Sequence, residues 1–165
     1  MTGNLTFEGY FDLHSSDGTI NQRCGKIDTH NAVVYLEAFR YAVNLSNSYQ
    51  ESFFDIGYRV KDTCDSRVLL NGIIKESCML MYTQGIFGLV GPVNSDAALE
   101  ISQILNVWGL TAVSYGASSS EFDQRHRHQN IFRTIPSDND QRQAMLGLFF
   151  YFGLVLILQL HSVKQ

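Results

Sequence analysis

The sequence predicts an α/β domain, a doubly wound and mostly parallel sheet with helices on both faces. Short apolar segments with strand character alternate with segments of helical periodicity along the chain. The helical segments are long enough for the crossovers that parallel strands require, about a dozen residues or more. A chain of 165 residues with 45% hydrophobic composition also has enough apolar material for one core.

Six segments have the length and pattern expected of strands, either apolar throughout or alternating between apolar and polar residues. They are residues 5–11, 53–60, 85–91, 110–115, 130–136 and 154–160. Residues 12–30, which follow the first of them, are polar and contain glycine, so we expect a long exposed loop there.

Four segments have the 3.6-residue periodicity of helices. The third has one apolar face and stops at Gly109, and the fourth begins with the capping residues Ser137 and Asp138. The four helices are expected at residues 31–45, 66–82, 97–108 and 137–153.

An uncharged run covers residues 144–158 near the end of the chain. A membrane-spanning helix is one interpretation, and a buried helix followed by a buried strand is the other. The run is shorter than the roughly 18 to 20 apolar residues of a spanning helix, which favours the buried helix and strand.

Charge and motifs exclude several functions. A net charge of -4 and a pI near 5.6 provide no basic face for nucleic acid. The nucleotide-binding patterns G-x-G-x-x-G and G-x-x-x-x-G-K-[ST] are absent, as is the G-x-S-x-G pattern of a serine nucleophile. We therefore expect no cofactor, no nucleic-acid partner and no catalysis.

The cysteines and the glycosylation sequons are relevant to whether the protein is secretory or cytosolic. Three cysteines without a C-x-x-C pattern are most simply one disulfide pair and one spare. The sequons at Asn4 and Asn44 permit glycosylation of a secretory protein. Residues 1–16 lack the pattern of a signal peptide, so either the protein is cytosolic or its true start is missing.

Two polar segments follow strands and lie where open α/β sheets bind ligands, beyond the carboxyl ends of the strands. In "GPVNSD", residues 91–96, Asn94 or Ser95 either caps the next helix or helps to bind a carboxylate. In "YGASSS", residues 115–120, the serines form either a solvated turn or the second half of such a site. Asp96 is unfavourable beside an anion because like charges repel.

A third polar segment, "DQRHRHQN", contains His126 and His128. Histidines two residues apart can bind a metal from a strand, but nothing nearby completes the coordination shell and the arginines repel a cation. We therefore expect a solvated loop and no metal site.

Four segments, in order, resemble the extracellular ligand-binding region of class C G-protein-coupled receptors, which include metabotropic glutamate and GABA type B receptors. The similarity spans residues 7–153, and its most specific part is the block around Trp108. The resemblance implies the periplasmic-binding-protein type I fold, with residues 1–153 as the first lobe and 154–165 as the start of a second. The segments are "IDTHNAVVYLEAFRYAVNLSN", "RVKDTC", "GLVGPVNSDAALEISQILNVWGLTAVSYGASSSEF" and "IFRTIPSDNDQRQAM".

The resemblance also implies site residues. Ser95 matches the family serine that holds the α-carboxylate of an amino acid, and Ser118 matches a second hydroxyl residue that contacts the ligand. Cys24 and Cys64 match a family disulfide, whereas Cys78 fits no expected pair. The neighbouring residues expected to line the ligand site are Asn94, Gly116 and Ala117.

One difference from the family sequence concerns the identity of the ligand. Tyr35 stands where metabotropic glutamate receptors have an arginine for the distal carboxylate, and a phenol cannot replace that bidentate cation. Ligand identity is thus open between glutamate-like, GABA-like and other amino acids.

The resemblance further implies a receptor dimer at the outer side of the cell membrane, anchored by segments that this chain lacks. Two alternatives share the fold, namely a natriuretic-peptide-type receptor and a bacterial solute-binding protein. A cytosolic α/β enzyme is the alternative from another class.

Overall fold

The computed structural model describes residues 5–16, 24–49, 54–63 and 85–153. Several sequence predictions fall outside these residues and stay predictions. They are the helix at 66–82, the strand at 154–160, and the roles of Asn4, Cys64 and Cys78.

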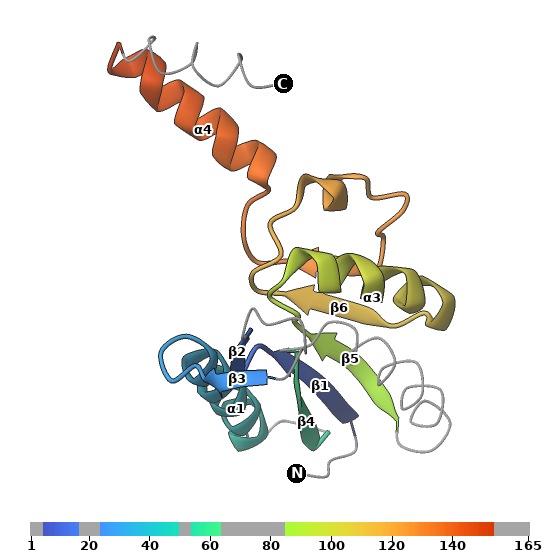
Figure 1. Ribbon diagram of the computed structural model, residues 1–165. Helices are drawn as coiled ribbons and strands as arrows, with labels where there is room; N and C mark the ends of the chain where they lie inside the picture. Colours follow the sequence, from blue (N-terminus) through green and yellow to red (C-terminus); the bar gives the residue numbers. More distant parts are fainter. Residues whose placement is uncertain (1–4, 17–23, 50–53, 64–84, 154–165) are drawn as a thin grey trace.

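The described chain is organised around a five-stranded parallel sheet with the order β4-β1-β5-β6-β7 (Figure 1). Its first two strands pair in register from Leu5 opposite Ile56 to Phe11 opposite Asp62. Because β1 lies between β4 and β5, the direction of winding reverses between β1 and β5, as in other doubly wound sheets. The strands are β1 (Leu5–Phe11), β4 (Ile56–Asp62), β5 (Ile86–Val90), β6 (Thr111–Ser114) and β7 (Ile131–Arg133).

Helices α1 (Ala32–Ser48) and α3 (Ser95–Trp108) cover opposite faces of this sheet. Phe11 of β1 packs on Phe39 of α1, with ring centroids 5.6 Å apart. The adjacent Tyr10 belongs instead to the core beneath α3. Since successive strand residues point to opposite faces, the two helices lie on different sides. The predicted doubly wound α/β fold is confirmed.

The main core lies between α3 and the sheet. The apolar face predicted for this helix is buried, and the helix ends at Gly109, whose φ of 68° is the left-handed conformation that glycine adopts easily. The buried residues of this core are Tyr10, Ile86, Leu89, Ala97, Ala98, Ile101, Leu105, Ala112, Ala117, Phe122 and Ile131.

The loop expected at residues 12–30 is interrupted by two short antiparallel strands, β2 (His14–Ser16) and β3 (Cys24–Ile27). The expectation of an uninterrupted loop was therefore wrong. Backbone hydrogen bonds make such a pair without any need for an apolar pattern, so composition does not reveal it.

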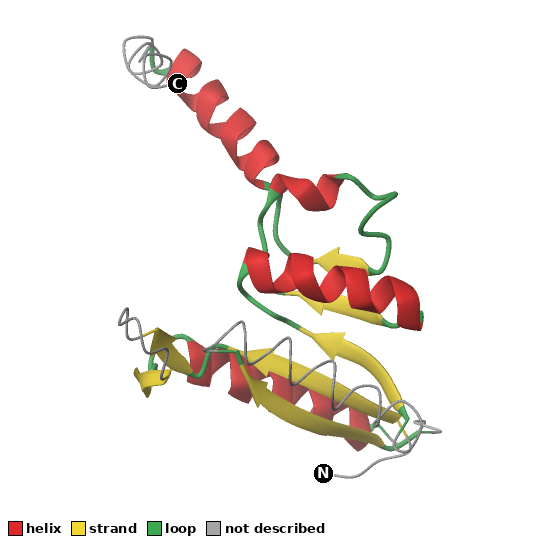
Figure 2. Ribbon diagram, turned by 45° about the vertical axis from the view of Figure 1, so that its right-hand side comes forward, coloured by secondary structure: helices red, strands yellow, loops and turns green. Residues whose placement is uncertain are grey.

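The final helix differs from its prediction in burial. Helix α4 (Asp138–Tyr151) has no buried residue, and Met145, Leu148 and Tyr151 are exposed. The buried helix expected in residues 144–158 is thus wrong for the described part, because α4 extends away from the sheet (Figure 2). Within the described ranges, no helix combines the length and apolar character needed to cross a bilayer.

Candidate ligand-binding site

The candidate site lies where the chain leaves β5 and β6, at the carboxyl edge of the sheet. Asn94 is the N-cap of α3, and its Oδ1 accepts hydrogen bonds from the amides of Asp96 (2.8 Å) and Ala97 (3.2 Å). The capping role that the sequence offered for Asn94 is confirmed. With these two amides satisfied, the adjacent Ser95 side chain is not needed as the cap.

Ser95 instead contacts the serine-rich loop after β6. Its Oγ accepts a hydrogen bond from the amide of Ser119 at 3.3 Å, so the residue after Ser118 touches Ser95 directly. Ser95, Ser118 and Ser119 are all half-buried, whereas Ser120 is exposed. The structure thus brings together the two segments that the sequence singled out, and the serine loop is not a fully solvated turn.

Gly116 and Ala117 are small enough for this loop to pack closely against its neighbours. A Cβ on Gly116 would lie 2.2 Å from Cγ2 of Val93, so only glycine fits against the segment before α3. Ala117 is buried in the main core. The buried Ser114 hydroxyl accepts from the Ala117 amide at 3.0 Å and donates to the Pro92 carbonyl at 2.6 Å, which joins the two segments again.

Arg133 at the end of β7 holds the same loop from the other side. Its Nη1 donates to the carbonyl oxygens of Ser119 (2.9 Å) and Ser118 (3.4 Å). Its Nη2 pairs with Asp123, which also accepts from the Ser137 hydroxyl at 2.7 Å. The Ser137 hydrogen bond, followed by Arg133, lowers the pKa of the Asp123 carboxyl. The sequence does not reveal the roles of Ser114 and Arg133, because these roles depend on contacts between segments.

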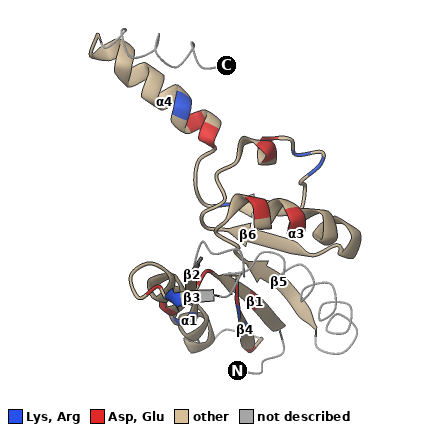
Figure 3. Ribbon diagram, viewed as in Figure 1, with Lys and Arg blue, Asp and Glu red and all other residues tan. Residues whose placement is uncertain are grey.

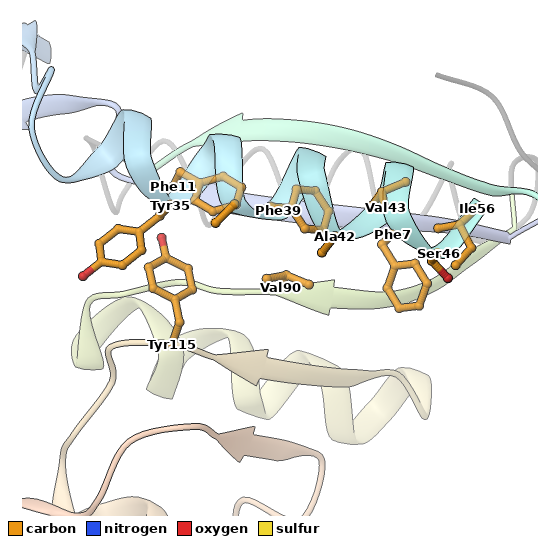
Figure 4. Close-up of a pocket in the computed structure, with 11 residues that line it drawn as sticks. Phe7, Phe11, Tyr35, Phe39, Ala42, Val43, Ser46, Ile56, Val90 and Tyr115 are labelled. Atoms are coloured by element: carbon orange, nitrogen blue, oxygen red, sulfur yellow. The ribbon is translucent and has the colours of Figure 1, made fainter. Parts of the chain in front are cut away.

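An aromatic pocket adjoins the loop on the α1 side of the sheet (Figure 4). Tyr115, which directly precedes Gly116, stacks on Phe11 at 5.6 Å and meets Tyr35 at 4.8 Å between ring centroids. Its hydroxyl donates to the Tyr10 carbonyl at 3.2 Å. Burial, the nearby Asp12 carboxylate and Tyr35 together raise the pKa of Tyr115.

The pocket has a volume of about 410 Å³, and none of the described residues that line it is charged. Its lining residues are Phe7, Phe11, Tyr35, Ala38, Phe39, Ala42, Val43, Ser46, Ile56, Val90 and Tyr115.

Acidic groups lie near both halves of the site. Asp96 is exposed in the first turn of α3, so solvent screens its repulsion of a bound anion. Figure 3 shows the acidic positions of α3 in red. Asp12 follows β1, and its Oδ1 is buried without a hydrogen-bond partner among the described residues. Burial and the neighbouring Asp62 raise the pKa of Asp12.

The histidine segment is only partly the solvated loop that we expected. His126 is exposed, but His128 is buried and its Nδ1 lies 2.8 Å from the hydroxyl of Ser102. That hydroxyl donates to the Leu99 carbonyl at 2.6 Å, so its oxygen accepts a hydrogen bond from the Nδ1–H of His128. Burial lowers the pKa of His128. Within the described ranges, no group of His, Cys, Asp and Glu could hold a metal.

A parallel sheet of this order, with converging loops at its carboxyl edge, defines a ligand-binding α/β domain. Comparison with protein families matches residues 34–155 to the receptor family ligand binding region. The match covers well over half of the 165 residues, and the chain belongs to this family.

Individual relatives agree with the family. The chain is 23% identical to metabotropic glutamate receptor 4 of Rattus norvegicus over 169 residues, which covers 90% of the chain and 18% of the receptor. It is 24% identical to metabotropic glutamate receptor 8 of Homo sapiens over 174 residues, which covers 93% of the chain and 19% of the receptor. The predicted resemblance to class C receptors is confirmed, and the chain spans about a fifth of the length of these curated relatives.

The described residues include only part of the predicted glycosylation and disulfide sites. Asn44 is exposed on α1 and thus accessible to solvent. The backbone of Cys24 lies in β3, but its side chain and Cys64 are outside the described residues, so the disulfide stays a prediction.

Proposed function

We propose that this chain is the first lobe of the extracellular ligand-binding region of an amino-acid-sensing class C receptor, and that it binds its ligand without catalysis. One observation carries the proposal most directly. The hydrogen bond from the Ser119 amide to Ser95 Oγ joins the two serine segments at the N-terminus of α3. This juxtaposition suits the two charged groups of an α-amino acid.

The chemistry assigns one group to each serine. Ser95 Oγ accepts from the Ser119 amide, and a serine hydroxyl that accepts one hydrogen bond can also donate its proton to a carboxylate. The N-terminus of α3 adds a favourable partial positive charge for that anion. The Ser118 hydroxyl has lone pairs to accept a hydrogen bond from the ligand ammonium. Asn94, Gly116 and Ala117 then define the shape of the site.

In the intact receptor, residues 1–153 would form the first lobe. The second lobe would follow α4, and residues 154–165 would be its beginning. Closure of that lobe over the ligand would favour the active arrangement of a receptor dimer, because the ligand binds the closed state more tightly. We also propose a Cys24–Cys64 disulfide, glycans on Asn4 and Asn44, and anchorage in the cell membrane by further segments.

A titration with glycine, the smallest α-amino acid, tests whether Ser95 and Ser118 bind its two charged groups. We expect glycine to shift the amide NMR signals of Ser95, Ser118 and Ser119 in the isotope-labelled 165-residue chain. Acetate and methylamine each supply only one of the two charged groups, so we expect smaller shifts. Because the tested 165 residues would contact the ligand from one side only, the expected dissociation constant is in the millimolar range.

Matched variants make the titration decisive. Ser118→Ala should weaken glycine binding about tenfold through the lost hydrogen bond. Ser120→Ala, in the same serine run but at an exposed position, should leave it unchanged. Equal effects of the two substitutions, or glycine shifts confined to other parts of the chain, would refute the proposed site. Micromolar binding by calorimetry would contradict the need for a second lobe.

A further inference from the structure

We infer that the ligand of this site is an amino acid with an uncharged apolar or aromatic side chain, which lies against Tyr35 and Tyr115. The inference rests on the proposed function, because the two serines must hold the charged groups of the ligand. It adds the chemical class of the remaining part of the ligand.

The position of Tyr115 connects the pocket to the serine loop. Tyr115 lies between β6 and Gly116, three residues before Ser118, so its ring and the serine loop leave the same strand end. Phe11, the last residue of β1, stacks on it at 5.6 Å. A side chain that projects from an amino acid held by Ser118 toward α1 would meet these rings first.

Tyr35 provides the second wall from α1. Its ring centroid is 4.8 Å from that of Tyr115 with a tilt of 40°, and Figure 4 shows the two rings together at one end of the pocket. Tyr35 is 45% exposed despite this contact. A ligand side chain could therefore bury additional aromatic surface on binding, which is favourable.

The electrostatics of the pocket disfavour a second carboxylate. None of the lining residues in the described part of the chain is charged, so a charged side chain of either sign would lose water without gaining a counter-ion from them. The Tyr115 hydroxyl is already engaged with the Tyr10 carbonyl. The Asp12 carboxylate, which acts on Tyr115, would repel an anion further.

The size of the pocket is compatible with a small ligand. Its volume of about 410 Å³ is within the range of about 300 to 1,000 Å³ that is usual for such sites. The inference concerns the end formed by Phe11, Tyr35 and Tyr115, because that end adjoins the serine loop.

The test compares glycine, L-leucine, L-phenylalanine, L-glutamate and L-lysine on the labelled 165-residue chain, each up to about 100 mM. We expect L-leucine and L-phenylalanine to bind about tenfold more tightly than glycine, through burial of their side chains. L-glutamate and L-lysine should bind no more tightly than glycine. The aromatic ring signals of Tyr35 and Tyr115 should shift only with the two apolar ligands.

Two substitutions in α1 form a matched pair. Tyr35→Ala should reduce L-phenylalanine binding to about the level of glycine, whereas Tyr41→Ala, at a position 67% exposed on the same helix, should not. Tyr35→Arg should reverse the selectivity and favour L-glutamate by about tenfold, because a guanidinium pairs with the distal carboxylate.

The outcomes separate the inference from the proposed function. If all five ligands bind equally and depend on Ser118, the inference fails and the proposed function stands. Tighter binding of L-glutamate or L-lysine than of L-leucine would also overturn the inference. If no ligand shifts the Ser118 and Ser119 signals, both fail.

Discussion

Arg133 Nη1 lies 2.9 Å from the carbonyl oxygen of Ser119, and this bond fixes the loop whose amide contacts Ser95. The Arg133 side chain is only 17% exposed. Three segments thus meet at one residue, Ser119, namely the start of α3, the serine loop and the end of β7. Positioning of the candidate site depends on this arrangement and not on the serines alone.

Removal of the guanidinium should loosen the serine loop. Arg133→Gln is expected to lower the free energy of unfolding by about 2 kcal/mol, since charge-assisted bonds to two carbonyls and Asp123 are lost. Hydrogen exchange at the Ser119 amide should become faster. Arg142→Gln in the exposed part of α4 is the control and should change neither measurement. Unchanged exchange at Ser119 in the Arg133 variant would contradict this role.

Gly116 should tolerate no side chain. Gly116→Ala is expected to destabilise the fold by about 1 to 3 kcal/mol, because the new Cβ clashes with Val93. Chemical denaturation measures the effect, and a second substitution, Val93→Ala, should recover part of it. Gly147→Ala is the control, since a Cβ there meets nothing within 4 Å. Equal stability of the two alanine variants would show that the close contact is absent in solution.

The cap of α3 gives a separate prediction. Asn94→Ala should cost about 1 kcal/mol of stability, because the amides of Asp96 and Ala97 lose their acceptor. Asn94→Asp keeps an acceptor at the helix N-terminus and should retain most of the stability. Thermal unfolding of both variants distinguishes these results, and a loss in Asn94→Asp as large as in Asn94→Ala would argue against capping.

His128 predicts a dependence of stability on pH. Its pKa in the folded state is lowered from 6.5, mainly by burial, so the unfolded chain binds a proton more readily. The contribution of His128 to the free energy of unfolding is complete above pH 6.5. It decreases as the pH falls through the lower pKa of the folded state. The charged and titratable groups that influence the pKa of His128 are Glu121, Arg125, His126 and Arg127.

Thermal unfolding between about pH 8 and about pH 5 checks this expectation. The unsubstituted chain should lose more stability across the range than His128→Gln, which has no proton to bind there. His126→Gln, at the exposed neighbouring position, should behave like the unsubstituted chain. An identical pH profile for His128→Gln and the unsubstituted chain would exclude the buried imidazole as a source of the dependence.

The sequence predicted the parallel sheet, and it indicated a candidate ligand site at the strand ends, because both depend on local patterns. The apolar positions Ala97, Ile101 and Leu105 repeat with helical spacing, and Gly109 marks the helix end. Strand ends followed by polar residues likewise indicate the ligand edge of an α/β sheet.

Other features depend on contacts that a linear pattern does not contain. The hydrogen bonds of Arg133 reach residues fourteen and fifteen positions earlier, and the pocket combines residues from α1, β1 and the loop after β6. His128 looked like part of a polar loop, yet its partner Ser102 lies in α3. Helix α4 has an apolar pattern, but nothing in the described part of the chain buries it.

A crystal structure of the chain grown with about 100 mM L-leucine would show whether Ser95 and Ser118 bind the two charged groups of an amino acid. We expect the ligand carboxylate within hydrogen-bond distance of Ser95 Oγ, the ammonium at Ser118 Oγ, and the side chain against Tyr35 and Tyr115. A ligand bound elsewhere, or bound with its ammonium at Ser95, would contradict this binding mode.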